Sequence, residues 1–248
     1  MEERGGHSGA PGNIGLRFRV VGEVLSRYPQ VKIGVLAGRD VEVGDSDPEL
    51  EDLVNRVIQE VKGGFGSGPV IRHPFIASWR AMYRSFGTTP GDYRPSAEAL
   101  LRRVLRGKGL PRINAAVDAY NALSLRHLVP MGGFDLDRVE GLISLRFSRG
   151  GEAFMPLRAS GPEETYEGEP VYADEARVLT RRWNHRDCDH TKITVDASNL
   201  ALFVDGSEDV PRESVERAVG DLESLLSRCC RGEYSSAMAD VRTPYVSL

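Results

Sequence analysis

The densest group of chemically capable side chains in this 248-residue chain lies in the segment RRWNHRDCDHTK, residues 181–192. Within six positions it brings together His185, Asp187, Cys188, Asp189 and His190. Histidine and cysteine are side chains that zinc prefers, but structural zinc sites usually pair them at short spacing with a second pair elsewhere. The remaining histidines are scattered and form no second pair, so the sequence favours no metal and implies no cofactor.

Two other kinds of hydrolytic site find little support. The sequence contains no G-x-S-x-G turn for a nucleophilic serine, and Cys188 lacks the surroundings typical of a catalytic cysteine. Asp135 and Asp137 could supply a general acid and a general base. Neighbouring acidic residues in a turn, however, are more often capping groups or solvated.

A polar stripe on a predicted helix is a further candidate. Residues 112–126 show helical periodicity, and Asn114, Asp118 and Asn121 follow one another at intervals of four and three positions. These positions lie beside the apolar ones that would face a core. Polar groups in such a place either brace neighbouring backbone or line a pocket, and the pattern leaves both possibilities open.

The elements that must position these residues indicate an α+β fold. Besides 112–126, helices are predicted at 46–62, 74–86, 96–106 and 211–230, and a strand or hairpin at 31–43. Ser46 and Glu49 have capping-box spacing at the start of the first helix. After Pro130, short alternating apolar runs separated by turns indicate antiparallel strands, among them KITVDAS at 192–198. We therefore predict helices followed by a mostly antiparallel sheet and a closing C-terminal helix.

The same patterns suggest how the chain is divided. We predict a flexible leader at 1–15, an N-terminal αβ portion at 16–70 packed on the core, a main domain at 71–231 and a C-terminal tail at 232–248. No apolar run approaches the roughly 20 residues of a membrane span, so no membrane partner is expected. Three cysteines, two of them adjacent, form no disulfide framework, which suggests a cytoplasmic protein.

Charge is unevenly distributed along the chain. The net charge is −4, yet nine basic residues between Arg72 and Arg112 face only two acidic ones, and the stretches 40–60 and 152–175 are acidic. Such a chain can present one basic face to a polyanion.

Several separated motifs, in order, resemble one known family. RINAAVDAYN at 112–121 is followed by PMGGFD at 130–135, LRFSRGGEAFMPL at 145–157, VLTRRWN at 178–184 and TKIT at 191–194. Together they resemble the B-three/B-four domain, the editing module of the phenylalanyl-tRNA synthetase beta subunit, over roughly residues 70–230. SWRAMYRSFG at 78–87 and RPSAEALLRR at 94–103 resemble the freestanding branch of that family.

The resemblance implies hydrolysis of the ester bond of mischarged aminoacyl-tRNA, without a metal or a conventional triad. Water would be positioned by backbone and polar groups, with help from the ribose hydroxyl of the substrate. In the synthetase the usual error is tyrosine on the phenylalanine tRNA. Here Gly132 stands at the position of the synthetase's histidine, with Gly133 next to it, so we do not expect tyrosine specificity to be inherited.

Site residues follow from the resemblance position by position. The ester and a water molecule would be framed by Asn114, Asn121, Gly132 and Gly133. The substrate would be bound by Asp118, Asp135, Arg181, Arg182, Trp183, Asn184 and Asp196, of which the arginines and Asn184 would hold the terminal adenosine or its phosphate. The tRNA would approach Arg80, Arg84, Arg102, Arg103 and Arg106.

The main expectation is therefore a freestanding deacylase of mischarged aminoacyl-tRNA, with tRNA as its partner. Two alternatives stay open. One is a module that binds an amino acid or an aminoacylated RNA end without hydrolysing it, which the missing histidine motivates. The other is hydrolysis of a small ester or amide, for which the basic stretch at 72–112 would be superfluous.

Overall fold

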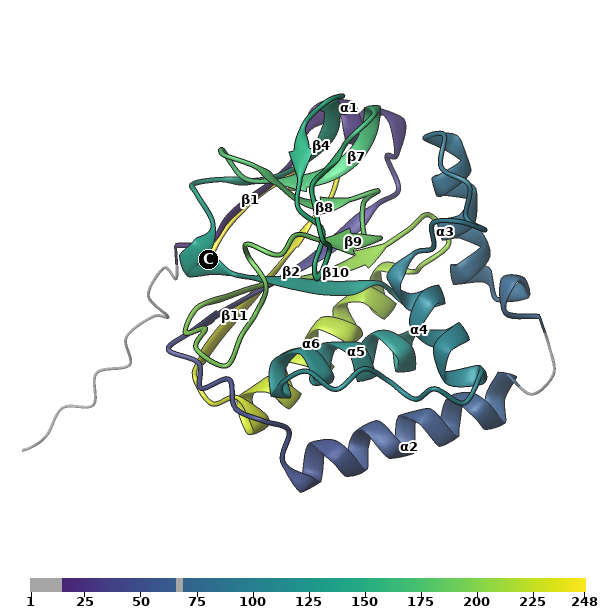
Figure 1. The fold of residues 1–248 in the computed structure, drawn as a ribbon, viewed down its shortest axis with the longest axis vertical. Helices are drawn as coiled ribbons and strands as arrows, with labels where there is room; N and C mark the ends of the chain where they lie inside the picture. The colour runs from purple at the N-terminus through teal and green to yellow at the C-terminus, as the bar shows by residue number, and fades with distance from the viewer. Residues whose placement is uncertain (1–14, 66–68) are drawn as a thin grey trace, which may run out of the picture.

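Two β-sheets packed against each other form the centre of the molecule (Figure 1). The computed structural model describes residues 15–65 and 69–248. The strands are β1 (Arg17–Val20), β2 (Lys32–Arg39), β3 (Met131–Asp135), β4 (Ile143–Arg149), β5 (Ala153–Phe154), β6 (Glu163–Glu164), β7 (Glu167–Ala173), β8 (Val178–Arg181), β9 (Arg186–Asp187), β10 (Leu200–Gly206), β11 (Glu233–Ala239) and β12 (Tyr245–Ser247). The six-stranded sheet has the order β12-β1-β4-β7-β8-β9, the four-stranded sheet the order β11-β2-β10-β3, and β5 pairs with β6.

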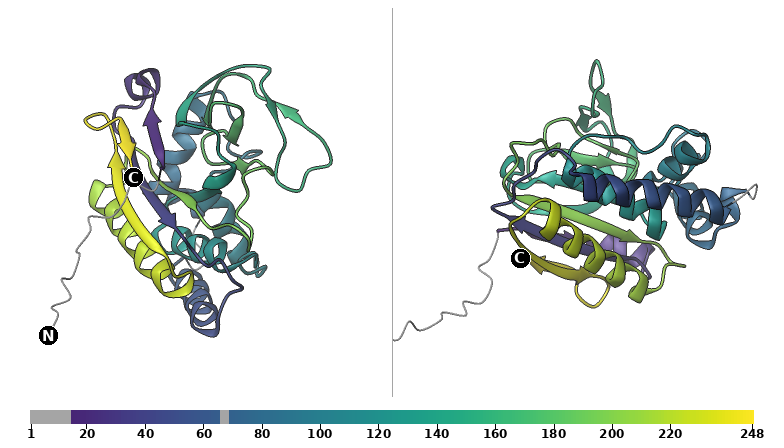
Figure 2. Two further views of the ribbon diagram at one scale, coloured as in Figure 1. Left: turned by 90° about the vertical axis from the view of Figure 1, so that its left-hand side faces the viewer. Right: turned by 90° about the horizontal axis from the view of Figure 1, so that it is seen from below.

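The helices lie mainly against one face of the four-stranded sheet. They are α1 (Gly22–Arg27), α2 (Pro48–Phe65), α3 (Pro74–Ser85), α4 (Ser96–Leu105), α5 (Ala115–His127) and α6 (Arg212–Cys229), with short 3-10 turns at Val70–Arg72 and Leu136–Arg138. Figure 2 shows α6 alongside the sheet, where it contacts β2, β10 and β11. The helix from the N-terminal half that packs against α6 is α5, which also contacts α2.

Alternation along the central strands explains the two layers. In β10, Leu200, Leu202 and Val204 belong to the core beneath the helices, whereas Ala201 and Phe203 belong to the core between the two sheets. Side chains of successive residues in a strand point to opposite faces, so a strand covered on both faces must be apolar throughout. β10 is antiparallel to both of its neighbours, and antiparallel strands often alternate apolar and polar residues. β10 lacks this alternation because both of its faces are covered.

The α+β class and the mostly antiparallel pairing are confirmed; among the paired strands of the described residues, only β1 and β4 run parallel. The predicted order was incomplete, because β1 and α1 precede the predicted strand β2, and because β11 and β12 follow α6. The expected tail at 232–248 was therefore wrong. It supplies a strand to each large sheet, since β11 pairs with β2 and β12 with β1.

Two local predictions also change. The cap of α2 is Asp47, which accepts a hydrogen bond from the backbone N–H of Leu50 at 2.8 Å, whereas Ser46 donates to Asp118 at 2.7 Å. Residues 192–198 form no strand. Instead, the carbonyl of Ile193 accepts from a side chain, that of Asn114, at 3.0 Å.

The predicted leader at 1–15 lies outside the described residues except for its last position. Within the described part of the chain, no helix combines the length and apolar character needed to cross a membrane.

Candidate functional site

Residues 182–185 of the polar segment 181–192 form the turn between β8 and β9, and the backbone of this turn is strained. Arg182 and Trp183 have φ values of 48° and 67°, in the left-handed region that non-glycine residues rarely occupy. The turn is held by the backbone N–H of Trp183, which donates to the carbonyl of Pro170 at 2.7 Å. The indole of Trp183 is fully buried and lies edge-on to Trp79, 5.5 Å between ring centroids. Packing thus compensates the strain and fixes the direction of the residues that follow.

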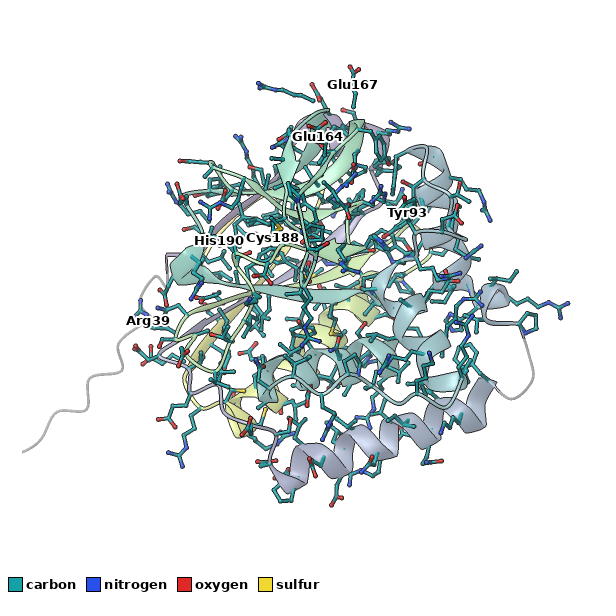
Figure 3. All side chains as sticks on the ribbon, in the orientation of Figure 1. Arg39, Tyr93, Glu164, Glu167, Cys188 and His190 are labelled. Atoms are coloured by element: carbon teal, nitrogen blue, oxygen red, sulfur yellow. The ribbon has the colours of Figure 1, made fainter. Side chains whose placement is uncertain are left out.

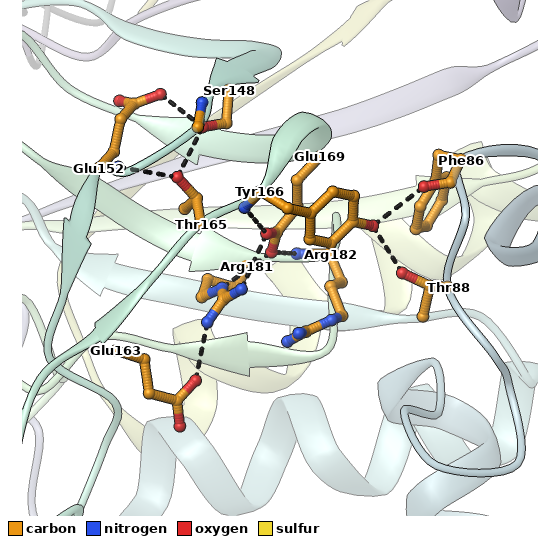
Figure 4. Close-up of polar contacts among 11 residues, drawn as sticks. Phe86, Thr88, Ser148, Glu152, Glu163, Thr165, Tyr166, Glu169, Arg181 and Arg182 are labelled. Carbon is orange, nitrogen blue, oxygen red and sulfur yellow. Dashed lines mark hydrogen bonds and ion pairs between the residues drawn. The ribbon is translucent and has the colours of Figure 1, made fainter.

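Arg181 and Arg182 do not have the role predicted for them. Arg181 is buried and donates from Nε and one terminal nitrogen to the two oxygens of Glu169, at 2.8 and 2.9 Å, and from the other to Glu163 at 2.8 Å (Figure 4). Such a bidentate pair occupies the guanidinium. Arg182 stacks on Tyr93 with its guanidinium 3.7 Å from the ring centroid, and Tyr93 comes from the loop between α3 and α4 (Figure 3). The geometry therefore does not favour these arginines as partners of adenosine or phosphate, because Arg181 is bound to two glutamates and Arg182 is stacked on a tyrosine ring.

Beside this turn lies a small cavity between the edges of the two sheets, which we call the aromatic cavity. It encloses about 390 Å³ including its mouth. Its polar lining consists of Ser96, Thr180, Asn184, His185, Asp187 and Asp205. Its remaining lining consists of Met131, Gly132, Phe134, Tyr172, Trp183 and Phe203. A concave site with aromatic walls and a few convergent polar groups is the usual form of a small-molecule site.

Asp205 lies at the end of β10 within this cavity. Its carboxylate accepts hydrogen bonds from the hydroxyl of Tyr172 at 2.6 Å and from the amide nitrogen of Asn184 at 3.0 Å. The amide oxygen of Asn184 in turn accepts from the hydroxyl of Tyr83 at 2.8 Å. Burial raises the pKa of Asp205 to about 7, and the nearby charge of Asp187 adds to the effect, although the hydrogen bonds oppose it.

Asp187 is the second carboxylate of the cavity and comes from the edge strand β9. One of its oxygens accepts from the hydroxyl of Thr180 at 2.7 Å. Burial raises the pKa of Asp187 to about 6, while the Thr180 hydrogen bond and the charge of Arg186 lower it. Within the described residues, neither Asp187 nor Asp205 forms an ion pair with a basic side chain.

No clear pattern in the sequence points to the pair Asp187 and Asp205. In the sequence, Asp187 is one member of the polar cluster at 181–192, and Asp205 is an acidic residue at the end of an apolar strand. The two residues are 18 positions apart and come from different sheets. Their proximity depends on the packing of the two sheets, which no local pattern encodes.

His185 also lines the aromatic cavity. Its Nδ1 lies 2.9 Å from the carbonyl oxygen of Arg94, so Nδ1 carries the proton and donates it. Burial lowers the pKa of His185, and neighbouring arginines lower it further against the opposing effect of that hydrogen bond. The imidazole is thus neutral at pH 7, with its lone pair on Nε2.

A second and larger cavity, the α5 cavity, adjoins the first and encloses about 940 Å³ including its mouth. Asp187 lines both cavities, and the adjacent residues Gly132 and Gly133 line one cavity each. The α5 cavity is lined by Ile113, Asn114, Val117, Tyr120, Gly133, Leu157, Arg158, Asp187, Asp189, Lys192, Ile193, Thr194 and Val195. The two cavities therefore meet at the edge of β3, opposite Asp187.

The two glycines differ in the space around them. A Cβ on Gly133 would lie 2.3 Å from Cδ2 of Leu202 and 2.9 Å from the carbonyl oxygen of Ala201, so this position requires glycine. A Cβ on Gly132 would have one neighbour within 4 Å, Oδ2 of Asp187 at 3.8 Å. The absence of a side chain at Gly132 thus leaves room in front of the carboxylate.

The polar stripe of α5 mainly braces backbone. Asn114 is the N-cap of α5: it accepts from the backbone N–H of Val117 at 3.0 Å, and its amide nitrogen bonds the Ile193 carbonyl. It lines the α5 cavity, but both of its polar atoms have partners. Asp118 is buried outside both linings and accepts from the backbone N–H of Ile113 at 2.9 Å. Asn121 lies outside both linings as well, so the predicted contacts of Asp118 and Asn121 with the substrate are not what the geometry favours.

Two further predicted contacts lie away from the cavities. Asp135 accepts from the backbone N–H of Asp137 at 3.2 Å and pairs with Arg138 at 3.1 Å, so it stabilises the turn after β3. Asp196 is exposed in a separate shallow groove that also includes Cys229. Both assignments as substrate-binding residues are corrected, because neither side chain lines the aromatic cavity or the α5 cavity.

The predicted basic approach surface is divided. Glu98 is fully buried and binds Arg80 at 2.8 Å and Arg102 at 2.7 Å. Arg80 thus joins α3 to α4, whereas Arg102 pairs with Glu98 within α4. The exposed members of the predicted surface are Arg84, Arg103 and Arg106.

The histidines and cysteine of the opening segment do not converge. Sγ of Cys188 is buried, 3.1 Å from the Thr191 hydroxyl, while His190 is exposed (Figure 3). Among residues 15–65 and 69–248, no three His, Cys, Asp or Glu side chains are grouped as metal ligands would be.

Comparison with known proteins identifies the family. The family model of the B3/4 domain matches residues 78–231. The chain belongs to the B3/4 domain family. It is 35% identical over 137 residues to the phenylalanine–tRNA ligase beta subunit of Chromobacterium violaceum, a match that covers 53% of this chain and 17% of that protein.

This B3/4 domain protein therefore spans only part of the length of the ligase beta subunit that it matches. Among solved structures, it is similar to an N-terminal fragment of the phenylalanyl-tRNA synthetase beta subunit from Pyrococcus horikoshii. That similarity has a TM-score of 0.45 at 14% identity and covers 90% of this chain and 53% of the fragment.

Proposed function

We propose that this B3/4 domain protein hydrolyses the ester bond of mischarged aminoacyl-tRNA in trans. The observation that carries the proposal is the meeting of two unlike cavities at Asp187 and the edge of β3. The smaller aromatic cavity suits an aminoacyl group, and the larger α5 cavity suits the terminal adenosine. The ester that joins these two parts would then lie between Asp187 and the Gly132–Gly133 backbone.

The backbone at this junction can stabilise the charge that develops on an ester carbonyl. The carbonyl of Pro130 accepts from the backbone N–H of Asp205 in β10, whereas the N–H of Asp135 donates to Thr191 on the opposite side of β3, each at 2.9 Å. Because backbone groups alternate along a strand, the N–H of Gly133 also turns away from β10. A fixed N–H group beside the ester would stabilise the tetrahedral intermediate.

Asp187 is the proposed proton acceptor for the attacking water. With a pKa of about 6, it is mostly a carboxylate above pH 7 and is a stronger base than an ordinary aspartate. Water would add to the ester carbon as Asp187 takes its proton. The bond from the carbonyl carbon to the ribose oxygen would then break, and that oxygen would take the proton back from Asp187, giving a free amino acid, an uncharged tRNA and the Asp187 carboxylate.

Basic groups around the cavities can bind the RNA. Arg158 and Lys192 line the α5 cavity and replace Arg181 and Arg182 as candidate partners for the terminal phosphate. Lys192 also pairs with Asp189 at 2.7 Å, so its contribution involves an exchange of partners.

The residue test is deacylation of a charged tRNA that the wild-type protein hydrolyses. Asp187→Asn should lower the single-turnover rate by roughly 10²–10⁴-fold, the usual contribution of a general base, with little change in the affinity for uncharged tRNA. Asp221→Asn is the matched control, because Asp221 binds His127 on the helical side of the molecule. An unchanged rate in Asp187→Asn would remove Asp187 from the reaction.

A binding module without hydrolysis is the second candidate. The open space at Gly132, where the synthetase has a histidine, supports it because one polar group of the related site is missing. This alternative predicts saturable binding of an aminoacylated RNA end whose ester is lost no faster than in buffer.

A further inference from the structure

The aromatic cavity contains two carboxylates, and the nearby cations are directed elsewhere. Asp187 and Asp205 both line it. Arg181 is bound to buried Glu169, Arg182 stacks on a tyrosine ring, and Arg186 donates to a backbone carbonyl at 3.0 Å. Asp205 is buried and Asp187 is half-buried. Carboxylates removed from water without a paired cation are costly, and a bound cation would relieve that cost.

The walls of the cavity have the complementary property. Phe134, Tyr172, Trp183 and Phe203 line it, and the rings of Phe134 and Tyr172 pack against that of Phe203, with centroids 5.7 and 5.0 Å apart. Aromatic rings attract an ammonium group that lies within about 6 Å of a ring face. His185 is neutral at pH 7 and so does not repel a cation.

Two buried polar atoms of the cavity lining are without a hydrogen-bond partner among the described residues. The hydroxyl of Ser96 and Nε1 of Trp183 are buried and, within the described residues, form no hydrogen bond. The Trp183 indole is near enough to Asp205 to lower the pKa of that carboxyl, but it does not reach hydrogen-bonding geometry. Unsatisfied buried polar groups are rare in native proteins and are often found at ligand sites.

We propose that the aromatic cavity binds a protonated primary amine of the aminoacyl group, with Asp187 and Asp205 as its counter-charges. The inference rests on the proposed function for the identity of the ligand as an aminoacyl ester. The amine can be the α-ammonium group, which every aminoacyl ester carries, or an ammonium group on the side chain. In either case the two carboxylates and the aromatic rings make the same contacts.

The test measures binding of adenosine derivatives that carry an acyl group in a 3′-amide linkage, which the site is not expected to hydrolyse. Three acyl groups of equal chain length are compared by calorimetry at pH 8: hexanoyl with no amine, norleucyl with the α-amine, and lysyl with both amines. A tenfold or larger gain in affinity from the hexanoyl to the norleucyl derivative identifies the α-ammonium as the bound group. The same gain from the norleucyl to the lysyl derivative identifies the side-chain ammonium. A tenfold gain corresponds to about 1.4 kcal/mol.

The variants Asp205→Asn and Asp187→Asn should each reduce that gain to threefold or less, while hexanoyl affinity stays within threefold of wild type and so reports an intact cavity. Asp221→Asn should keep the gain. The inference is overturned if the wild-type protein binds all three derivatives within threefold of one another, or if the gain survives in both cavity variants. An amine preference without turnover of any ester would refute only the proposed hydrolysis, whereas turnover without that preference would refute only this inference.

Discussion

Replacing Asp205 by asparagine should change how the stability of the protein depends on pH. Burial raises the pKa of Asp205 from 3.8 to about 7, so the folded protein binds a proton between these values that the unfolded chain has released. The free energy of unfolding therefore falls as pH rises through this window. A difference of roughly three pKa units, at 1.36 kcal/mol each, corresponds to about 4 kcal/mol.

An asparagine at position 205 has no proton to lose and can keep both hydrogen bonds. Its amide oxygen can accept from Asn184, and its amide nitrogen can donate to the Tyr172 hydroxyl, which is both donor and acceptor. The unfolding free energy of the variant should therefore lack the decline with rising pH that the Asp205 carboxyl causes in the wild type. Relative to wild type, the variant should gain several kcal/mol in unfolding free energy between pH 5 and pH 8.

The assay is urea unfolding at half-unit pH steps, compared as the difference between variant and wild type so that all other titrating groups cancel. Asp240→Asn is the control. Burial raises the pKa of Asp240, but backbone N–H groups of Thr243 and Arg242 and the charge of Arg212 lower it more, so its titration lies below pH 4. Its difference from wild type should be constant from pH 5 to pH 8. A constant difference for Asp205→Asn would refute the account of Asp205 as a buried carboxyl without a cation.

Three other outcomes follow from the packing and the charges. Gly133→Ala should lower the unfolding free energy by roughly 1–3 kcal/mol, measured by urea unfolding, because its Cβ would overlap Leu202, whereas Gly132→Ala should cost less than about 0.5 kcal/mol. Glu98→Gln should cost roughly 2–3 kcal/mol in the same assay, because two arginines lose a buried partner; no loss would contradict that role. Replacing exposed Arg103 and Arg106 by glutamine should weaken tRNA binding and reduce the salt slope by up to about 2 in filter binding, and an unchanged slope would place the RNA elsewhere.

The sequence predicted helices better than it predicted the strand order. The apolar periodicity of α2 and α6 is local, so their existence followed from the pattern, although Asp47 rather than Ser46 provides the cap. The strand β11 is only partly buried along most of its length, so the segment 232–248 carried little apolar signal. It becomes a strand because the edge of β2 is available to pair with it.

The site was partly predictable. Motif positions pointed to Gly132, Gly133 and Asn114, and these residues do line the two cavities. Arg181 was misjudged because an exposed and a buried arginine look alike in a sequence, and its partner Glu169 comes from another strand. Asp205 was missed because its importance depends on burial and on contact between two sheets, both of which are tertiary properties.

The most direct test of the central claim is the initial rate of amino acid release from a panel of tRNAs. Each tRNA is charged with its cognate and its near-cognate labelled amino acids and incubated with the wild-type protein or with buffer alone. We predict that at least one mischarged pair is deacylated faster with the protein than in buffer, and that the Asp187→Asn variant loses this activity. If every pair is lost at the buffer rate while tRNA binding is still measured, the protein is a binding module and the proposed hydrolysis is wrong.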